Sequence, residues 1–362
     1  MMPASQPTKN LLIMAAGTGG HIFPGLAIAD AMRLRGWQVS WLGTQSGMET
    51  DIVPRYKIAM DNINFSGLRG KGIVHTLKGA LKLVNSFFTC WRIFSQRQPD
   101  LILGMGGYVT VPGGLIAALR GKPLVLMNAD AALLLSNKIL RPLANKILFG
   151  LPPENKASAN KEIVTGNAIR NDICQLSRPQ ERYAARSGVL RILVVGGSLG
   201  AKVLNETIPA AIALMVEADR PKITHQSGKN HIDGLRKRYT QLGIDAEVVD
   251  FINDMPERYA EADLVICRAG AITVSELTAA GVASILIPFI ASSTSHQIDN
   301  ARWMAKLGAA THLPQQELNP KSLAEILQNM TRERCAQMAE LAYASGQRDA
   351  SQTIATILEK LA

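Results

Sequence analysis

The residues best suited by type and spacing to do chemistry lie in three glycine-rich turns. These turns are Gly17-Thr18-Gly19-Gly20-His21, Gly104-Met105-Gly106-Gly107-Tyr108 and Gly196-Gly197-Ser198-Leu199-Gly200-Ala201. A glycine-rich turn that opens a helix points backbone N–H groups and the positive helix end at an anion, usually a phosphate. One such turn is equally typical of an ordinary tight connection, but three of them favour two phosphate-bearing ligands.

His21, at the end of the first turn, admits three roles. It could act as a general base on an attacking sugar hydroxyl, since a histidine titrates in the right pH range. It could instead hydrogen-bond a pyrophosphate or position the turn, or it could be an inert part of the scaffold. A helix N-terminus lowers the pKa of a histidine, which would keep this side chain neutral and basic.

A short apolar strand precedes two of the turns, and a helical pattern follows each. Residues 11–16 lead into a helical run through Ala27 and Leu34, and residues 191–195 open the same pattern about 180 residues later. Strand, glycine-rich turn and helix form the opening unit of a doubly wound α/β domain, so two copies predict two such domains. Further strands are expected at 101–103, 124–126, 264–266 and 284–287, and further helices at 73–94, 275–280 and 351–361.

We therefore expect an α/β fold of two facing Rossmann-like domains with a cleft between them. The loop-like residues 152–160 lie near the boundary. The first domain would span 1–164 and the second 165–342, and the last helix, 343–362, would close the second domain or pack back on the first. A nicotinamide dehydrogenase is not expected, because residues 38–42 hold no acidic residue where that fingerprint places one.

Composition narrows the class of protein. The chain has 362 residues, of which 47% are hydrophobic and 19% charged, an ordinary globular composition. Its four cysteines lie far apart without ligand spacing, which favours a reducing compartment over a disulfide framework or a zinc site. We see no signal-peptide pattern and no apolar run long enough to span a membrane, so we expect a soluble or peripheral protein.

The net charge of +10 is concentrated in the first half of the chain. Residues 1–164 hold 18 of the 39 Lys and Arg but only 8 of the 29 Asp and Glu, and the two signs balance in the rest. No nucleic-acid-binding motif accompanies this charge. An anionic membrane surface is therefore the expected partner, and nucleic acid is not.

In order and spacing, the glycine-rich turns and the motifs between them resemble those of the MurG family of peripheral glycosyltransferases. The resemblance covers most of the chain. The matching pieces are 17–25, 67–72, 104–108, 166–167 with Arg170, 196–201, 225–229, 251–255, 268–276 and 296–301.

The resemblance implies a GT-B fold and an inverting transfer of N-acetylglucosamine from UDP-GlcNAc to undecaprenyl-pyrophosphoryl-muramoylpentapeptide (lipid I). The product would be lipid II of peptidoglycan biosynthesis, with the donor on the second domain and the lipid pyrophosphate on the first. No cofactor is implied, and no protein-bound metal is expected, since a helix dipole and an arginine can stabilise the departing UDP. The implied location is the cytoplasmic face of the bacterial inner membrane, with cell-wall synthesis and division proteins as further partners.

The resemblance also assigns residues to the donor. Glu276 would accept hydrogen bonds from two ribose hydroxyls, although a first-turn glutamate that favours the helix dipole would look the same. Phe251 would pack on the uracil or in the core, and Gln297 would bind sugar hydroxyls or lie solvated at a helix start. Arg170 and Ser198 would bind the donor phosphates. The implied donor set is Thr18, Gly19, Gly20, Asp130, Arg170, Ser198, Phe251, Ile252, Ala271, Ile272, Thr273, Val274, Ser275, Glu276 and Gln297.

The acceptor side departs from the family pattern. The implied acceptor set is Gly17, His21, Gly104, Gly106, Gly107, Tyr108 and Asn137. The chain reads Met127-Asn128-Ala129-Asp130 where the family usually shows His-Glu-Gln-Asn, and Ala16 stands where a glycine is common. Either this loop is rebuilt for the same lipid, or the choice of acceptor or the rate is altered. Asp130 would add a negative charge near a pyrophosphate and would need a neighbouring cation.

Residues 65–97 form a basic, amphipathic segment with six Lys and Arg and no Asp or Glu. Apolar residues from Ile73 to Trp91 recur on one helical face, and polar and basic residues recur on the other. An ordinary domain helix with its apolar face inward would show the same pattern. A lipid acceptor favours membrane contact instead, through Leu68, Arg69, Lys71, Ile73, Lys78 and Lys82.

Three kinds of function are therefore compatible with the sequence. The first is a membrane-associated N-acetylglucosaminyltransferase. The second is another nucleotide-sugar enzyme, such as an epimerase or a transferase with a different acceptor, and the third is a non-catalytic cell-wall scaffold. Release of UDP from UDP-GlcNAc in the presence of a lipid-linked muramoyl acceptor would separate them.

Overall fold

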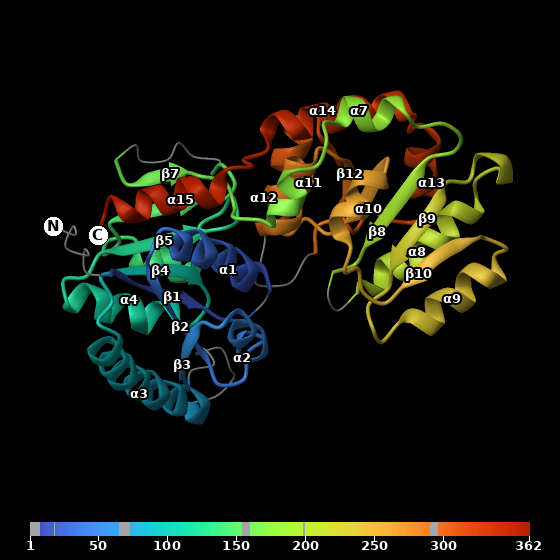
Figure 1. Cartoon of the computed structure of the whole chain (residues 1–362). Helices are drawn as coiled ribbons and strands as arrows, with labels where there is room; N and C mark the ends of the chain where they lie inside the picture. Colours follow the sequence, from blue (N-terminus) through green and yellow to red (C-terminus); the bar gives the residue numbers. More distant parts are fainter. Residues whose placement is uncertain (1–7, 18, 65–72, 154–159, 198–199, 290–295) are drawn as a thin grey trace. The chain divides into compact units, whose positions relative to one another are not determined.

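The chain folds into two compact units (Figure 1). In the computed structural model the first unit comprises residues 1–169 and 349–362, and the second comprises residues 170–348. The first unit thus ends slightly beyond the boundary expected at residue 164, and it includes the C-terminal segment. The described residues are 8–17, 19–64, 73–153, 160–197, 200–289 and 296–362, with residues 73–83 described by their backbone alone.

The first unit is built on a seven-stranded parallel sheet with the strand order β3-β2-β1-β4-β5-β6-β7. This order, which reverses beside β1, is that of a Rossmann-type sheet. Its strands are β1 (Asn10–Ala15), β2 (Gln38–Thr44), β3 (Ala59–Ile63), β4 (Leu101–Gly106), β5 (Leu124–Asn128), β6 (Lys146–Phe149) and β7 (Glu162–Val164). Its helical segments are α1 (Gly19–Leu34), α2 (Glu49–Ile52), η1 (Val53–Tyr56), α3 (Ile73–Arg97), α4 (Thr110–Leu119), α5 (Leu135–Leu140) and α15 (Ala350–Glu359).

Two apolar clusters cover the two faces of this sheet, and β1 alternates between them. Leu11 and Ile13 pack in the cluster that includes α1 and α15. Leu12 and Met14 pack in the cluster that includes α3 and α4. A parallel strand buried on both faces has to be apolar throughout, which is why these strands are visible in the sequence as unbroken apolar runs.

The C-terminal helix α15 packs within the first unit, alongside α1 (Figure 1). Ile354 and Leu358 are fully buried in the shared cluster. Arg35, just past the end of α1, forms an ion pair with Glu359 in which Nη1 and Oε2 are 2.6 Å apart. The last helix therefore covers the sheet that the first residues of the chain begin.

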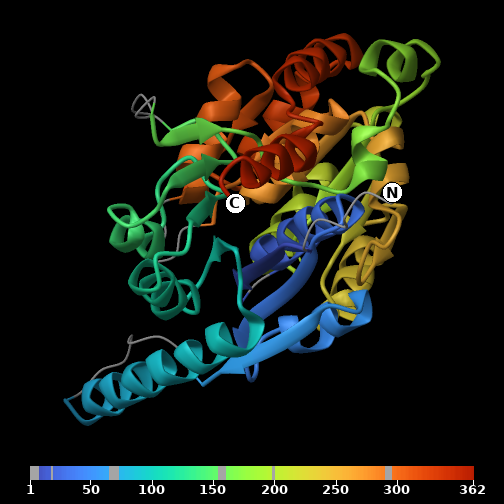
Figure 2. The same cartoon turned by 60° about the vertical axis from the view of Figure 1, so that its left-hand side comes forward.

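Helix α3 turns its expected apolar face to solvent where its side chains are described. Val84, Phe88 and Trp91 share one helical face and are 53%, 72% and 49% exposed. The side of the helix that packs on the unit is formed instead by residues such as Cys90 and Phe94, which are buried. The interpretation of an ordinary helix with that apolar face inward is therefore wrong for this part of α3. Figure 2 shows the amino-terminal end of α3 reaching away from the sheet.

The second unit is built on a six-stranded parallel sheet with the order β10-β9-β8-β11-β12-β13. Its strands are β8 (Arg191–Val195), β9 (Lys222–Gln226), β10 (Ala246–Val249), β11 (Leu264–Cys267), β12 (Ala283–Leu286) and β13 (Ala310–His312). Its helical segments are α6 (Asn171–Cys174), α7 (Pro179–Ala184), α8 (Lys202–Ala213), η2 (Glu217–Asp219), α9 (Ile232–Gln241), α10 (Met255–Glu261), α11 (Ala271–Ala280), α12 (His296–Lys306), α13 (Pro320–Gln328) and α14 (Arg332–Ser345). The expected pair of Rossmann-like α/β domains is confirmed.

Candidate active site

In the first unit, two glycine-rich turns meet at the carboxyl ends of β1 and β4, which are paired neighbours in the sheet. Gly106 and Gly107 have φ angles of 106° and 86°, in the region that favours glycine. A Cβ on Gly107 would lie 2.8 Å from the carbonyl oxygen of Ala16, and one on Gly106 would lie 3.1 Å from Nε2 of His21. Glycine at both positions therefore lets the second turn close on the first.

His21 is the third residue of α1 and is partly buried. Its Nδ1 lies 3.4 Å from the carbonyl oxygen of Ala16, and since a carbonyl can only accept, Nδ1 carries the proton. Burial lowers the pKa of His21, opposed by the Ala16 hydrogen bond and by the charge of Asp130. The imidazole is thus held neutral, with Nε2 as its basic nitrogen.

The loop after β5, where the chain departs from the family pattern, is organised by two buried amides. The side-chain nitrogen of Asn128 donates to the carbonyl oxygens of Asp130 and Ala132 at 2.7 and 3.1 Å. Its oxygen accepts from the backbone of Leu134 at 2.9 Å and from the Asn137 side chain at 3.1 Å. Asn137 has no exposed surface, so its assignment to the acceptor is corrected. It supports this loop from within.

The remaining acceptor candidates differ in what they can reach. Tyr108 is half-exposed and is the last residue of the second turn. Gly104 is buried inside β4, where a Cβ would lie 2.5 Å from the Thr110 methyl carbon, so it serves close packing and not ligand contact. Gly17 is exposed, but its N–H donates to Oε2 of Glu49 at 3.2 Å. This N–H is therefore already used within the protein.

Two glycines implied in donor binding, Gly19 and Gly20, begin α1 and are partly exposed. Thr18 lies outside the described residues. Asp130 lies in the loop after β5, close enough to His21 for its charge to raise the pKa of that histidine. Gly19, Gly20 and Asp130 therefore lie at or beside the first turn, which also holds the acceptor candidate His21.

In the second unit, the donor candidates gather on α11, which begins directly after the turn that follows β11. Ile272, Thr273 and Glu276 are partly exposed along one side of this helix. Ala271 and Ser275 are buried, with only a small exposed fraction. The first turn of a helix presents its N–H groups and positive dipole end to an anion, so this end of α11 suits a diphosphate.

Val274 is removed from the donor set by the structure. The residue is fully buried, and its N–H donates to the carbonyl oxygen of Gly270 at 2.9 Å. It therefore offers a ligand neither a side-chain surface nor a free amide. The run from 271 to 276 splits into a ligand-accessible side and a core side, a distinction that depends on how α11 packs.

Glu276 lies in the second turn of α11, so the interpretation as a first-turn, dipole-favouring glutamate is wrong. The hydroxyl of Tyr259 donates to its Oε2 at 3.2 Å, and Arg170 lies 3.7 Å from its Oε1. Burial raises the pKa of Glu276, and the charge of Arg170 and the Tyr259 hydrogen bond oppose that shift. A partly buried carboxylate held on two sides is well suited to receive a pair of hydroxyl donors.

Phe251 and Ile252 follow β10 and divide between surface and core. Phe251 is 54% exposed, so its alternative role in the core is wrong, and its ring is free to pack on a flat ligand. Its N–H donates to the side chain of Asp250 at 2.8 Å. Ile252 is buried and packs into the unit.

Gln297 is the second residue of α12, and its side chain already makes a hydrogen bond within the protein. Its Oε1 accepts from the N–H of Phe289 at 2.8 Å, and the residue is partly buried, so the freely solvated alternative is wrong. This leaves the Gln297 NH₂ group as the donor available for a hydroxyl. Arg170 caps the short helix α6 with its guanidinium partly exposed. Ser198 lies outside the described residues.

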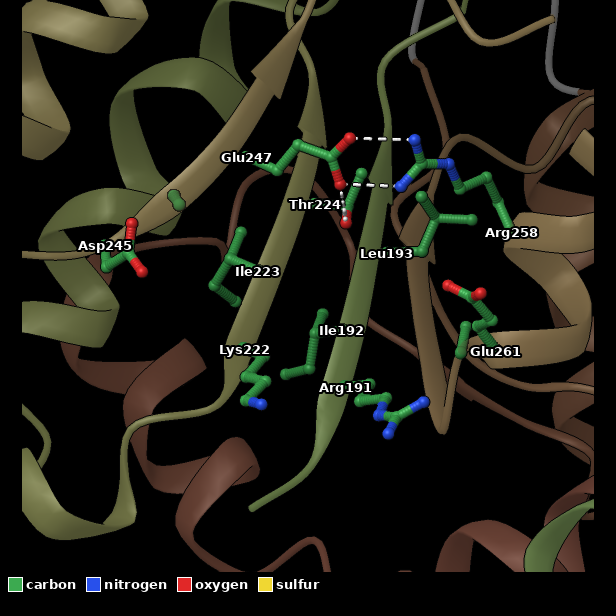
Figure 3. Close-up of a pocket in the computed structure, with 12 residues that line it drawn as sticks. Arg191, Ile192, Leu193, Lys222, Ile223, Thr224, Asp245, Glu247, Arg258 and Glu261 are labelled. Atoms are coloured by element: carbon green, nitrogen blue, oxygen red, sulfur yellow. Dashed lines mark hydrogen bonds and ion pairs between the residues drawn. The ribbon is translucent and has the colours of Figure 1, made fainter. Parts of the chain in front are cut away.

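A hollow of about 500 Å³ on the second unit lies away from these residues (Figure 3). It is lined by the amino-terminal halves of β8 and β9 and by the start of β10, and none of the candidates lines it. Two of its charged residues pair with each other: Arg258 of α10 is 2.6 Å from Glu247, which also accepts from Thr224. Doubly wound sheets bind ligands at the carboxyl ends of their strands, so we place the candidate site there and not in this hollow.

Two further features concern metals and membranes. In the part of the chain that the structure describes, no group of three or more His, Cys, Asp or Glu side chains is placed to hold a metal ion. Among the helices of those residues, none is both long and apolar enough to cross a membrane.

Family models match both units in sequence. Residues 11–149 match the glycosyltransferase family 28 N-terminal domain, and residues 191–354 match the glycosyltransferase family 28 C-terminal domain. The chain belongs to glycosyltransferase family 28. Its two units correspond in order to the two domains of this family, and the expected GT-B fold is confirmed.

Relatives within family 28 match the chain over almost its whole length. A protein of Janthinobacterium sp. (strain Marseille), named UDP-N-acetylglucosamine--N-acetylmuramyl-(pentapeptide) pyrophosphoryl-undecaprenol N-acetylglucosamine transferase, is 65% identical over 98% of this chain and 99% of its own. A protein of the same name from Methylibium petroleiphilum is 54% identical over 98% of this chain and 98% of its own. The crystal structure of Acinetobacter baumannii MurG matches with a TM-score of 0.86 and 35% identity, over 97% of this chain and 99% of that one.

A UDP-GlcNAc 2-epimerase from Neisseria meningitidis is similar in structure, with a TM-score of 0.66, but only 13% identical. It covers 98% of this chain and 100% of its own. Such a likeness shows a shared fold and carries no argument for a shared reaction.

Proposed function

We propose that this family 28 enzyme transfers N-acetylglucosamine from UDP-GlcNAc to the lipid-linked muramoylpentapeptide lipid I, with inversion at the anomeric carbon, and so forms lipid II. The observation that carries the proposal is 65% identity over 98% of the chain to a relative named as that transferase. The candidate residues support it, because a carboxylate, a helix N-terminus and an exposed aromatic ring lie on the second unit. They suit a ribose, a diphosphate and a base.

On the donor side, Glu276 accepts the two ribose hydroxyls while the Tyr259 hydroxyl donates to its Oε2. The exposed ring of Phe251 packs on the uracil. The first turn of α11 and the guanidinium of Arg170 face the diphosphate and stabilise the negative charge that develops on the departing UDP. The Gln297 NH₂ group donates to a hydroxyl of the sugar.

On the acceptor side, Nε2 of His21 takes the proton from the attacking sugar hydroxyl. The supporting geometry is the bond from its Nδ1 to Ala16, which leaves Nε2 as the basic nitrogen. Gly107 and Tyr108 in the neighbouring turn line the approach of the acceptor pyrophosphate. Asp130 lies near enough to His21 to stabilise the imidazolium that forms when the proton is transferred.

We further propose that the enzyme binds peripherally to the anionic cytoplasmic face of the inner membrane through α3. The support is the exposed face of Val84, Phe88 and Trp91 on a helix within a segment with no acidic residue. Apolar side chains of this kind insert at a bilayer surface while Lys and Arg bind anionic lipid headgroups. Of the contacts expected from the sequence, Leu68, Arg69 and Lys71 lie outside the described residues, and Ile73, Lys78 and Lys82 lie where only the helix backbone is described.

Proteins of cell-wall synthesis and cell division are proposed as further partners, because the acceptor and the product are intermediates of wall assembly. This part of the proposal rests on the reaction alone. Co-purification of such proteins with the tagged, membrane-bound enzyme would test it.

The test of the proposed reaction is UDP release by the purified chain. With UDP-GlcNAc and a short-chain lipid I analogue, we expect UDP to appear only when both substrates are present. A Glu276→Ala variant provides the control for contaminating activity. UDP release that does not depend on the acceptor, or conversion of UDP-GlcNAc to an epimer, would contradict the proposal.

A further inference from the structure

Glu49 is a buried carboxylate beside the first glycine-rich turn, and no part of the proposed reaction uses it. It is the first residue of α2 and has no exposed surface. Burying a carboxylate is costly unless its oxygens receive hydrogen bonds, so its partners indicate what it serves.

Two of its three hydrogen bonds come from the end of β2. Oε1 accepts from the Thr44 N–H at 2.9 Å and from the Thr44 hydroxyl at 2.6 Å. These bonds fold the connection between β2 and α2 and would suffice for a purely structural anchor. They leave the second oxygen, Oε2, unexplained.

Oε2 accepts from the N–H of Gly17 at 3.2 Å, across 32 positions of sequence. The backbone around Glu49 is shaped to admit this approach. A Cβ on Gly43 would lie 2.8 Å from Cγ of Glu49, and one on Gly47 would lie 2.1 Å from Oε2. Glycine at both positions leaves the space that the carboxylate occupies.

The Gly17 N–H and the Ala16 carbonyl belong to the same peptide group. Glu49 holds that group at its nitrogen, and Nδ1 of His21 donates to its oxygen at 3.4 Å. A hydrogen bond to an ionised acceptor is stronger than a neutral one and polarises the peptide, which makes its oxygen a better acceptor. The carboxylate and the imidazole are thus linked through one peptide plane.

We propose that Glu49 is a positioning residue for His21, acting through the Ala16–Gly17 peptide. It fixes the plane whose carbonyl oxygen selects the Nδ1-protonated tautomer and directs Nε2 toward the acceptor. The inference rests on the proposed function of His21 as the base. Glu49 itself touches neither substrate nor reacting atoms.

The test is Glu49→Gln, which keeps the size of the side chain but turns one oxygen into an N–H donor. In one orientation the amide NH₂ group would face the N–H of Gly17, and in the other it would face the N–H of Thr44. Two donors therefore oppose each other in either case. We expect kcat to fall roughly ten-fold or more, while the Kd for UDP-GlcNAc stays within about two-fold of wild type.

Two variants control for a structural effect. Thr44→Val removes the hydroxyl bond to Oε1 but keeps the bond from Gly17. Glu162→Gln alters another buried carboxylate of the first unit, at the start of β7. Its Oε1 forms an ion pair with Nη2 of Arg141 at 2.7 Å. Both are expected to lower the melting temperature and to leave kcat within about two-fold of wild type.

A second measurement reads the tautomer directly. With ¹⁵N-labelled histidine, the NMR signals of His21 in the wild-type protein should show a protonated Nδ1 and a bare Nε2, and Glu49→Gln should lose this uniform state. A wild-type His21 protonated at Nε2, or a folded Glu49→Gln variant with wild-type kcat and tautomer, would overturn the inference. If the wild-type chain transferred no sugar, the proposed function would fail, and the tautomer would still decide the role of Glu49.

Discussion

The hydroxyl of the fully buried Tyr259 donates to Oε2 of Glu276 at 3.2 Å, so the carboxylate proposed to bind ribose is held from the core side. Burial raises the pKa of Tyr259 well above its usual value, which keeps the phenol protonated and able to donate. The burial of Glu276 likewise raises its own pKa, and the charge of Arg170 opposes that shift. The position and the charge of Glu276 therefore depend on residues that no ligand needs to touch.

Glu276→Ala is expected to weaken UDP-GlcNAc binding by about 1.5–3 kcal/mol, because it removes a charged acceptor from two hydroxyls. Calorimetric titration of the folded variant measures this directly. Glu257→Ala, at an exposed position on α10 of the same unit, is the matched control and should bind the donor normally. A Glu276→Ala variant with wild-type donor affinity would remove this residue from the site.

Tyr259→Phe is expected to weaken donor binding by about 1 kcal/mol, roughly five-fold, because Glu276 loses a neutral hydrogen bond but keeps its charge. The phenyl ring preserves the packing, so the variant should fold. The same titration as for Glu276→Ala gives the Kd. Equal affinity in Tyr259→Phe and wild type would show that Tyr259 serves only the core.

Strands and glycine-rich turns were predictable because their signals are local. A parallel strand buried on both faces reads as an apolar run, as at Leu11 to Met14, and a tight turn to a helix reads as glycine. These two signals sufficed for the two Rossmann-like units. The order of the motifs then pointed to the family.

Contacts between distant segments were not predictable in the same way. Glu49 reaches Gly17 across 32 residues, and nothing near it in the sequence marks the bond. Helix α3 carries apolar residues on two sides, Cys90 on one and Phe88 on the other, and periodicity cannot say which side meets a neighbour. Val274 lies in a functional run, but only the packing of α11 reveals that it is buried.

Phe88→Ser combined with Trp91→Ser is expected to weaken binding to anionic vesicles roughly thirty- to nine-hundred-fold, since each apolar side chain contributes about 1–2 kcal/mol at a bilayer interface. Vesicle sedimentation measures the bound fraction. Leu214→Ser, at an exposed apolar position of the second unit, is the matched control. Undiminished vesicle binding by the double variant would place the membrane contact elsewhere.

Charge reversal of Arg69, Lys71, Lys78 and Lys82 to glutamate should also release the protein from anionic vesicles while leaving UDP binding intact. Each basic residue near such a surface contributes about 1 kcal/mol, and salt screens the effect. The same vesicle assay at low and high salt separates this contribution from the apolar one. Equal vesicle binding by wild type and the reversed variant at low salt would contradict the prediction.

His225 should make the stability of the second unit fall as the solution becomes acidic. It is fully buried, its Nδ1 is 2.9 Å from the Tyr239 hydroxyl, and burial lowers its pKa from 6.5 to about 3. In the unfolded chain His225 is protonated below about pH 6.5, whereas in the folded protein it stays neutral down to about pH 3. The free energy of unfolding therefore decreases as the pH falls through this window. Relative to the value near neutral pH, the loss at about pH 5 is about 2 kcal/mol.

Urea unfolding near pH 7.5 and near pH 5 measures that loss of stability. In His225→Gln the loss between the two pH values should be smaller than in wild type by about 2 kcal/mol. The variant is expected to be less stable at both pH values, so the difference between them carries the test. His231, at an exposed position of the same unit, provides the control substitution His231→Gln. An identical pH dependence in wild type and His225→Gln would show that this histidine is not held neutral.

Transfer of N-acetylglucosamine to a lipid-linked muramoyl acceptor is tested most directly by the structure of its product. Purified wild-type chain is incubated with UDP-GlcNAc and a lipid I analogue, and the lipid is isolated for mass spectrometry and NMR of its new glycosidic bond. We predict a lipid heavier by one N-acetylhexosamine residue, joined through a β linkage, as inversion of the α-linked donor requires. An unmodified lipid in the presence of folded, donor-binding protein, or an α-linked product, would contradict the proposed reaction.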